Sequence, residues 1–250
     1  NYTVVADKGL EINFLNGASI ISYSHLKLSG TEESPIIITS TDSTGQGILV
    51  LGTKAESVLD YVYFNNLSNP SQNGWELTGA VTFYESDVSI NNCVFSNNRR
   101  GDDYLNIVRS KFDIKNTLFS DTKGDAFDAD FSKGSISNVS VMRCGNDAID
   151  ISGTILKIDN VFFDTIGDKG LSAGENSRII ANNVNISNSE IAVCSKDMSV
   201  IKISDVNLQN IKIGFTAFQK KDEFGPGRIQ GSNVQMKKVS FPYLIETYSN

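Results

Sequence analysis

The sequence is poor in the residues that usually cross-link or interrupt a fold. Its 250 residues include three cysteines, four prolines, one tryptophan and one histidine. Cys93, Cys144 and Cys194 are far apart in the chain and form no short metal-binding spacing, which argues against both a zinc site and a disulfide framework. We therefore expect buried or partly buried free thiols. The one histidine, His25, is far from the other candidate residues and is expected to be a surface or turn residue.

Two further absences restrict the partners of the chain. No run of 18 apolar residues is present, so we expect no membrane-spanning helix. The net charge is −7 and the pI about 4.8, whereas binding to a phosphate backbone needs clustered lysine and arginine. The composition therefore predicts no nucleic-acid partner. A surface rich in Asn, Ser and Thr favours an extracellular or cell-surface location, with the periplasm as an alternative.

The start of the chain also lacks familiar signals. There is no initiating methionine, and no basic segment followed by an apolar one. The chain begins in the middle of its pattern at Asn1. We expect it to be a mature or excised part of a larger multidomain protein.

What the chain does contain is a pattern that repeats every 22 residues between positions 103 and 188. Its apolar column consists of Leu105, Phe127, Ile149 and Leu171. Three polar columns keep the same period, and they consist of Asn106, Asp128, Asp150 and Ser172; of Asp103, Asp125, Asp147 and Lys169; and of Asn116, Asn138, Asn160 and Asn182. A period of this length indicates a solenoid.

Within each unit, apolar and polar residues alternate, as over residues 127–130 and 149–152, and this alternation is typical of β-strands. Leucine-rich repeats have a similar length but need several leucines at fixed positions, so they are excluded. Two or three short strands per unit predict a right-handed parallel β-helix with coils of about 22 residues, in which equivalent residues lie about 4.8 Å apart. The Asn column then marks a left-handed bend where amide side chains bond to one another or to the backbone.

On its repeat length, strand alternation and Asn column, the chain resembles the pectin-lyase-like right-handed parallel β-helix superfamily over roughly residues 10–240. The resemblance implies an all-β fold with little or no helix. It does not imply one activity, because the superfamily includes polysaccharide lyases, hydrolases, epimerases, adhesins and non-catalytic surface domains.

We expect a single domain over residues 1–250, because a solenoid grows by adding coils. Its parts are an opening coil at 1–30, insertions at 65–78 and 219–227, and a C-terminal cap at 241–250. The first insertion contains Trp75, which is equally consistent with a ligand contact and with covering an open coil.

Five aspartates fall on two neighbouring coils of the predicted solenoid. Strand alternation points Asp128, Asp130 and Asp150 outward and places Asp125 and Asp147 at the preceding corner. At such spacing two like charges repel by about 1 kcal/mol in water and several-fold more when desolvated, so protons or a cation must offset them. Three interpretations stay open: a solvated ladder offset by lysines such as Lys169, an acid/base site, and a Ca²⁺ site with the ligands Asp125, Asp128, Asp147 and Asp150.

We predict that this Asp-rich sheet face binds an extended polysaccharide, with Ca²⁺ as a candidate cofactor. Coils 102–189 carry no insertion that would close a cleft, and a bare, slightly concave sheet suits a long chain. The expected ligand-binding residues are Tyr84, Asn106, Arg109, Asp128, Asp130, Asp150 and Lys196.

The resemblance implies an alternative function. Polysaccharide lyases of this superfamily use a Lys or Arg base, and cations neutralise a uronate carboxylate. A lyase or related carbohydrate-active enzyme would then use Lys169, Asp150 and Asp128 as catalytic residues. A polygalacturonase-like hydrolase is not favoured, because segments 145–150 and 167–172 lack the histidine and the downstream Arg-Ile-Lys element of that group. A third hypothesis is a structural stalk or adhesion domain that binds no ligand.

Overall fold

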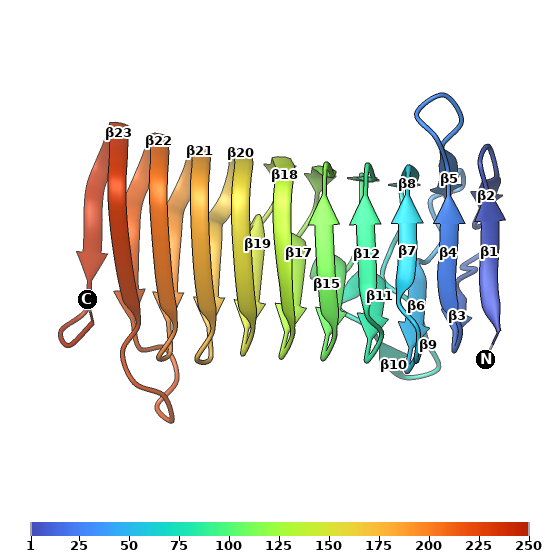
Figure 1. Cartoon of the computed structure of the whole chain (residues 1–250), viewed down its shortest axis with the longest axis horizontal. Coiled ribbons are helices and arrows are strands. Elements are labelled where there is room, and N and C mark those ends of the chain that lie inside the picture. Colours follow the sequence, from blue (N-terminus) through green and yellow to red (C-terminus); the bar gives the residue numbers. More distant parts are fainter. Residues whose placement is uncertain (1, 250) are drawn as a thin grey trace.

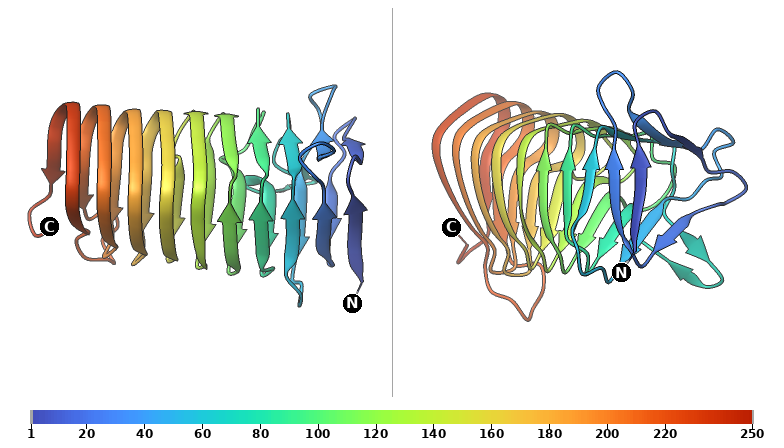
Figure 2. Two further views of the ribbon diagram at one scale, coloured as in Figure 1. Left: turned by 45° about the horizontal axis from the view of Figure 1, so that its top comes forward. Right: turned by 45° about the vertical axis from the view of Figure 1, so that its right-hand side comes forward.

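The structure is a computed structural model that describes residues 2–249, and its described part contains strands and turns but no helix. Twenty-one of the 23 strands belong to one connected set of parallel strands (Figure 1). Each coil of the chain adds a strand beside its equivalent in the previous coil, as Figure 2 shows from two sides. The expected all-β, right-handed parallel β-helix is confirmed.

The strands form three parallel sheets that run the length of the solenoid. Sheet 1 contains β3 (Ile20–Ser22), β6 (Ile48–Leu51), β11 (Gly79–Tyr84), β14 (Asp103–Val108), β17 (Asp125–Asp130) and β19 (Ile149–Ser152). Sheet 2 contains β1 (Thr3–Asp7), β4 (His25–Ser29), β7 (Ser57–Asp60), β12 (Val88–Asn91) and β15 (Lys111–Lys115). Sheet 3 contains β2 (Glu11–Asn13), β5 (Ile36–Thr39), β8 (Val62–Asn65), β13 (Val94–Ser96) and β16 (Leu118–Thr122).

Later strands bend through more than one sheet. β18 (Lys133–Cys144) passes through sheets 2 and 3. Four longer strands pass through sheets 2, 3 and 1 in turn, and they are β20 (Ile155–Gly174), β21 (Arg178–Lys196), β22 (Val200–Phe218) and β23 (Arg228–Ile245). The predicted register is exact where the repeat is strict, since Leu105 pairs with Phe127, Phe127 with Ile149 and Ile149 with Leu171.

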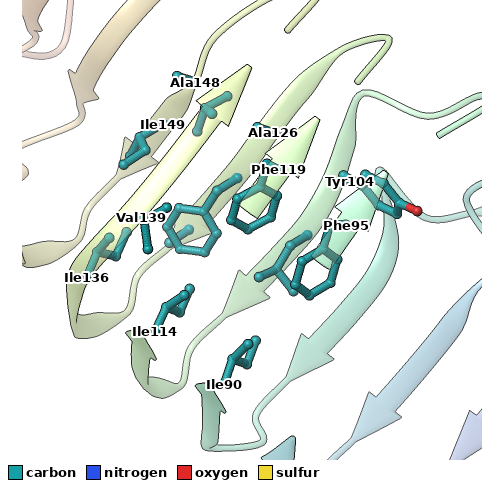
Figure 3. Packing of buried hydrophobic residues seen from close by; sticks show 14 of the residues in the cluster. Ile90, Phe95, Tyr104, Ile114, Phe119, Ala126, Ile136, Val139, Ala148 and Ile149 are labelled. Atoms are coloured by element: carbon teal, nitrogen blue, oxygen red, sulfur yellow. The ribbon is translucent and has the colours of Figure 1, made fainter. Parts of the chain in front are cut away.

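The apolar columns fill the interior between the three sheets. Figure 3 shows Ile90, Ile114 and Ile136 following one another in successive coils, with phenylalanines stacked beside them. The rings of Phe64, Phe95 and Phe119 stack with centroid distances of 4.8 Å at each step. Since parallel strands are spaced about 4.8 Å apart, this ring stack follows directly from the register. The three cysteines are buried free thiols, as expected.

The Asn column forms the corner between sheets 2 and 3. Asn116, Asn138 and Asn160 adopt positive φ values of 48°, 53° and 55°, the left-handed conformation that Asn tolerates better than most residues. The Nδ2 of Asn138 donates to the Oδ1 of Asn116 at 3.1 Å, and the Nδ2 of Asn160 donates to the Oδ1 of Asn138 at 2.7 Å. The predicted bend and its amide ladder are therefore both present.

The insertions and the chain ends complete the architecture. The first insertion contains the antiparallel hairpin of β9 (Ser71–Gln72) and β10 (Trp75–Glu76), and Trp75 on it is 38% exposed. Residues 219–227 form a loop between β22 and β23. Residues 241–245, which we expected to form a terminal strand or cap, continue β23 in sheet 1 beside β22. Asn1 of the opening coil and Asn250 of the expected cap lie outside the described residues.

Candidate acidic site on sheet 1

Three aspartates line the corner at which the chain enters sheet 1. Asp103, Asp125 and Asp147 are 2%, 6% and 2% exposed, so the corner predicted for Asp125 and Asp147 is buried. The reason lies in the glycines beside it. A Cβ on Gly124 would lie 2.0 Å from the carbonyl oxygen of Asp102, and coils that approach so closely leave little room for water around the carboxylates.

Backbone and side-chain donors hold these carboxylates in place. Oδ1 of Asp125 accepts from Nδ2 of Asn146 at 2.6 Å and from the backbone N–H of Asp147 at 2.7 Å. Despite these donors, burial and the neighbouring Asp147 charge raise the pKa of Asp125 to about 8. Burial likewise raises the pKa of Asp103 to about 7, with Asp102 and more distant aspartates adding to the effect. The corner therefore holds protons near neutral pH.

Lys169 continues this column and is paired. Its backbone N–H donates to Oδ1 of Asp147 at 3.0 Å, and its Nζ lies 3.3 Å from the same oxygen and also contacts Asp168. Burial opposes the charge on Lys169, but Asp147 and Asp168 outweigh burial and raise its pKa above the ordinary value. Burial still raises the pKa of Asp147 to about 6, with Lys169 opposing the increase. A lysine held in its protonated form neutralises negative charge and is a poor proton-abstracting base.

The outward column of sheet 1 lies beside the buried corner. Asp128 pairs in register with Asn106 on one side and with Asp150 on the other. The Nδ2 of Asn106 donates to Oδ2 of Asp128 at 2.8 Å. Desolvation, followed by repulsion from Asp103, Asp130 and other aspartates, raises the pKa of Asp128 well above its ordinary value. A half-buried carboxyl that keeps its proton can donate a hydrogen bond as well as accept one.

Asp150 has a different environment from that of Asp128. Its Oδ1 has no hydrogen-bond partner among residues 2–249, although Nζ of Lys196 lies 3.6 Å away. The Lys196 side chain is 9% exposed and reaches Asp150 from two coils further along the solenoid. Ser172, the next residue in the column, is fully buried, and its Oγ also has no partner. Along this column, Asp128 therefore has an amide partner, whereas Oδ1 of Asp150 and Oγ of Ser172 accept no hydrogen bond from residues 2–249.

The outermost column and one insertion border the site. Burial, followed by repulsion from Glu175 and Asp150, raises the pKa of Asp130. Lys221 of the 219–227 insertion pairs with Glu175, and its backbone N–H donates to Oδ1 of Asp197 at 2.8 Å. The insertion is therefore anchored beside Asp130.

The other two predicted ligand-binding residues form a separate pair. Nη1 of Arg109 donates to the phenolic oxygen of Tyr84 at 3.0 Å and lies 3.4 Å from Glu85. Tyr84 is connected to Asp130 only through Val108, because Tyr84 pairs with Val108 and Val108 with Asp130. Tyr84 and Arg109 thus extend the face by two coils instead of joining the Asp cluster.

The metal prediction is matched only in part. One carboxylate oxygen each from Asp125, Asp147 and Asp150 lies within 4.8 Å of the others, whereas Asp128 is not part of this triad. Ca²⁺ needs six to eight oxygens. Here the Lys169 ammonium already contacts Asp147. The backbone N–H of Asp147 and the side chain of Asn146 both donate hydrogen bonds to Oδ1 of Asp125. The donor set therefore fits protons and lysine ammonium groups better than a fully coordinated Ca²⁺ ion.

Some members of this site were not predicted. Asp103 was recognised as part of the repeat but not as a site residue, because its burial depends on how closely the coils approach. Asn146, Asp168 and Ser172 were also not predicted as site residues, although their positions in or next to the Asp columns could have identified them.

Comparison with known proteins supports the fold, whereas the chemistry of the site has to be inferred from its residues. Neither family models nor curated proteins match the chain. Among solved structures, an alginate lyase from Paenibacillus sp. str. FPU-7 is similar with a TM-score of 0.53 and 13% identity, over 99% of each chain. The chain shares the parallel β-helix fold with this structure. The β-helix catalytic domain of a GH87 α-1,3-glucanase, solved with tetrasaccharides, is similar with a TM-score of 0.52 and 14% identity.

The overlap with these two β-helix proteins differs in extent. The match to the glucanase covers 98% of this chain but 61% of the glucanase chain. At such identities the β-helix scaffold is shared, and a function must be argued from the site itself. The described part of the chain contains no helix long and apolar enough to cross a membrane.

Proposed function

We propose that the outward face of sheet 1 around Asp128, Asp130 and Asp150 binds an extended polysaccharide. The observation that carries the proposal is the pair of half-buried aspartates, Asp128 and Asp150, set one coil apart on this face, with the buried Asn106 donating to Asp128 from the coil before. Hydroxyl groups of a sugar both donate and accept hydrogen bonds. The half-buried side chains of Asp128, whose pKa is raised, and of Asp150 offer both kinds of partner.

The charge of the face bears on the kind of glycan. Lys169, Lys196 and bound protons offset the five aspartates, so this face has no excess positive charge to attract an anionic ligand. A neutral polysaccharide is therefore the preferred ligand of this face. An extracellular or cell-surface location would suit such a ligand, and both location and a larger multidomain context are part of the proposal.

A carbohydrate-active enzyme is the second candidate, and a specific observation favours it. Asp128, with its raised pKa, lies next to Asp150 in the sheet, and glycoside cleavage requires a protonated acid beside a second carboxylate. Lys169 in its protonated state would supply charge neutralisation. The lyase alternative with Lys169 as base is less favoured, because Asp147 and Asp168 hold that proton.

The test is incubation of the purified chain with neutral and acidic polysaccharides, with Ca²⁺ and with a chelator. Both retention on the glycan and shortening of the glycan are measured. Retention of a neutral glycan that the Asp128→Asn/Asp150→Asn variant loses would support the binding face. Shortening by the wild type that the double variant lacks would make the chain an enzyme. If the glycan is neither retained nor shortened, the structural stalk becomes the favoured interpretation.

A matched control tests whether the site, rather than lost negative charge, is responsible. Asp113→Asn/Asp121→Asn removes two carboxylates whose side chains pair with Lys115 and Arg143 outside sheet 1. This control should bind as the wild type does. A chelator should not abolish retention if protons and lysines offset the cluster, and loss of retention in chelator would favour the Ca²⁺ site.

A further inference from the structure

A second charged surface lies on the outer face of sheet 2. It consists of exposed cations on β15, β18 and β20–β23, whose sheet 2 segments face the reader in Figure 1. We call these residues the basic strip: Lys111, Lys133, Lys157, Arg178, Lys202 and Arg228. The six sheet 2 segments between residues 111 and 232 carry seven cationic and two acidic side chains, a net charge of +5. The whole chain has a net charge of −7, so the strip opposes the overall charge.

The register arranges these cations in two neighbouring columns. Lys111 pairs with Lys133, and the same column reaches Arg178 through Ile155. The second column runs from Lys157 through Ile180 to Lys202. With about 4.8 Å between coils, six coils extend the strip over roughly 24 Å. A ligand that contacts all of it must be long and must lie along the solenoid axis.

The strip cations are not used inside the protein. Within residues 2–249, no carboxylate oxygen lies within 4.0 Å of the charged group of any strip residue. The two acidic side chains of these segments have other partners. Asp113 pairs with Lys115 at 2.5 Å, and Asp159 accepts from Nδ2 of Asn182 at 3.0 Å. Six cations held in a row without partners create a positive potential along one face.

Shallow hollows lie between the cations. One is bounded by Lys111, Lys133 and Lys157, with Ile155 and Gly134 also lining it. Another, on the next coils, is lined by Ile180, Lys202 and Gln230, among others. Ile155 and Ile180 are 48% and 58% exposed. Each hollow thus combines an aliphatic surface with flanking positive charge, which suits an anionic sugar unit.

We propose that the basic strip binds an acidic polysaccharide, one bearing carboxylate or sulfate groups, laid along the solenoid axis. Arginine binds such groups through two parallel hydrogen bonds, and lysine binds them as a point charge. The exposed apolar side chains of the strip, Ile155 and Ile180, are aliphatic, whereas single-stranded nucleic acid is held by stacking on aromatic rings. This site is separate from the sheet 1 face and takes ligands of the opposite charge preference.

The experiment measures equilibrium binding of the full chain to polygalacturonate, dextran sulfate and uncharged dextran at low and at physiological salt. The strip variant is Lys133→Glu/Arg178→Glu/Lys202→Glu. The control variant, Lys8→Glu/Lys54→Glu/Lys237→Glu, makes the same change in net charge with exposed lysines that lie outside the strip. The wild type and the control should bind the two acidic polymers, and the strip variant should bind at least about tenfold more weakly. Circular dichroism checks that each variant is folded.

Several results would overturn the proposal. Equal losses in the strip and control variants would reduce it to an effect of net charge, and absence of wild-type binding to both acidic polymers would reject it. Vesicles with and without phosphatidylserine form a further arm. Binding to anionic vesicles but not to the polymers would assign the strip to a membrane surface instead. If the wild type binds dextran sulfate but not polygalacturonate, the ligand would be a sulfated polysaccharide. Because Asp128→Asn/Asp150→Asn leaves the strip intact, it should retain acidic-polymer binding even if the sheet 1 proposal fails.

Discussion

At the scale of single residues, the buried corner of sheet 1 makes stability depend on pH. The pKa of Asp125 is about 8 in the fold, whereas an unfolded aspartate has a pKa near 3.9. Between these values the folded state binds more protons than the unfolded state, so stability falls as the pH rises. The contribution of this group is complete below about pH 4 and is lost as the pH passes through about 8.

Thermal unfolding at pH 5 and pH 8 checks this prediction. The free energy of unfolding should be greater at pH 5 by at least about 2 kcal/mol, roughly 4–8 °C in Tm. Asp125→Asn keeps the Oδ1 acceptor and should reduce this dependence, while Asp103 still contributes because burial raises its pKa to about 7. Asp121→Asn is the control, because Arg143 lowers the pKa of the exposed Asp121 carboxyl, and it should leave the slope unchanged. A Tm that rises from pH 5 to pH 8 would contradict the account.

Lys169 offers a second prediction at this scale. Its ammonium group lies 3.3 Å from the 3% exposed side chain of Asp147, so Lys169→Met would leave a buried charge without its partner. We expect a loss of about 3–5 kcal/mol in the free energy of unfolding, measured by urea titration. Lys169→Met/Asp147→Asn should recover much of that loss. A single variant as stable as the wild type would mean that Lys169 does not neutralise the cluster.

At the scale of elements, the Asn ladder has two roles that substitutions can separate. Asn138 has a φ of 53° and also donates to Asn116, whereas Asn207 donates to Asn185 without a positive φ. Asn138→Ala should cost about 1–3 kcal/mol, because it combines backbone strain with the loss of two hydrogen bonds, one donated to Asn116 and one accepted from Asn160. Asn207→Ala should cost about 0.5–1.5 kcal/mol, the hydrogen bond alone. Asn138→Gly removes the strain and should lie between them.

Urea unfolding of these three variants measures the difference. If Asn138→Gly were as unstable as Asn138→Ala, left-handed geometry would not be the reason for Asn in this column. If Asn207→Ala had no effect, an amide–amide hydrogen bond between neighbouring coils would contribute nothing, and the loss in Asn138→Ala would be assigned to backbone conformation.

The elements also show what the sequence could and could not predict. Strand alternation and the period of 22 were sufficient for sheet 1, because Leu105, Phe127 and Ile149 occur in register. A second corner ladder was missed. The backbone N–H of Ser110 donates to Oγ of Ser132, and that of Ser132 donates to Oγ1 of Thr154, both within the buried corner between sheets 1 and 2. The period was visible, but small hydroxyl residues are common in turns and gave no distinct signal.

The site was less predictable than the fold for a physical reason. The sequence brought Asp128 and Asp150 to one face, since side-chain alternation alone decides that. The burial of Asp125 and the reach of Lys196 to Asp150 depend on coil packing and side-chain length across two coils. Such distances between residues far apart in the chain are not encoded in a local pattern.

At the scale of the whole molecule, the last coil among the described residues is largely exposed. Phe241, Tyr243 and Leu244 on β23 are 57%, 73% and 57% exposed, and one edge of β23 has no neighbouring strand among the described residues. Exposed apolar edge strands favour association. We expect concentration-dependent association of the chain, which Tyr243→Lys/Leu244→Lys should reduce.

Sedimentation velocity over a range of concentrations tests this expectation. Phe162→Lys is the control, because Phe162 is 46% exposed but lies in the middle of the solenoid, where β20 has neighbours on both sides. The control should associate as the wild type does. Equal association of all three proteins would mean that β23 does not mediate it.

The two faces give the molecule opposite charge preferences. Protons and lysines offset the negative charge of the Asp-rich face of sheet 1. The six cations of the basic strip on sheet 2 have no carboxylate partners among residues 2–249. A solenoid can carry two such faces because each column belongs to one sheet and continues unchanged from coil to coil.

The most direct test of the sheet 1 face is calorimetric titration of the neutral glycan that the panel retains best into three proteins. These are the wild type, Asp128→Asn/Asp150→Asn, and Lys133→Glu/Arg178→Glu/Lys202→Glu. The account predicts that the wild type and the strip variant bind with the same affinity and that the Asp variant loses at least about tenfold, the value of one charged hydrogen bond. Unchanged affinity in the Asp variant, with loss in the strip variant, would contradict the assignment of the glycan to sheet 1.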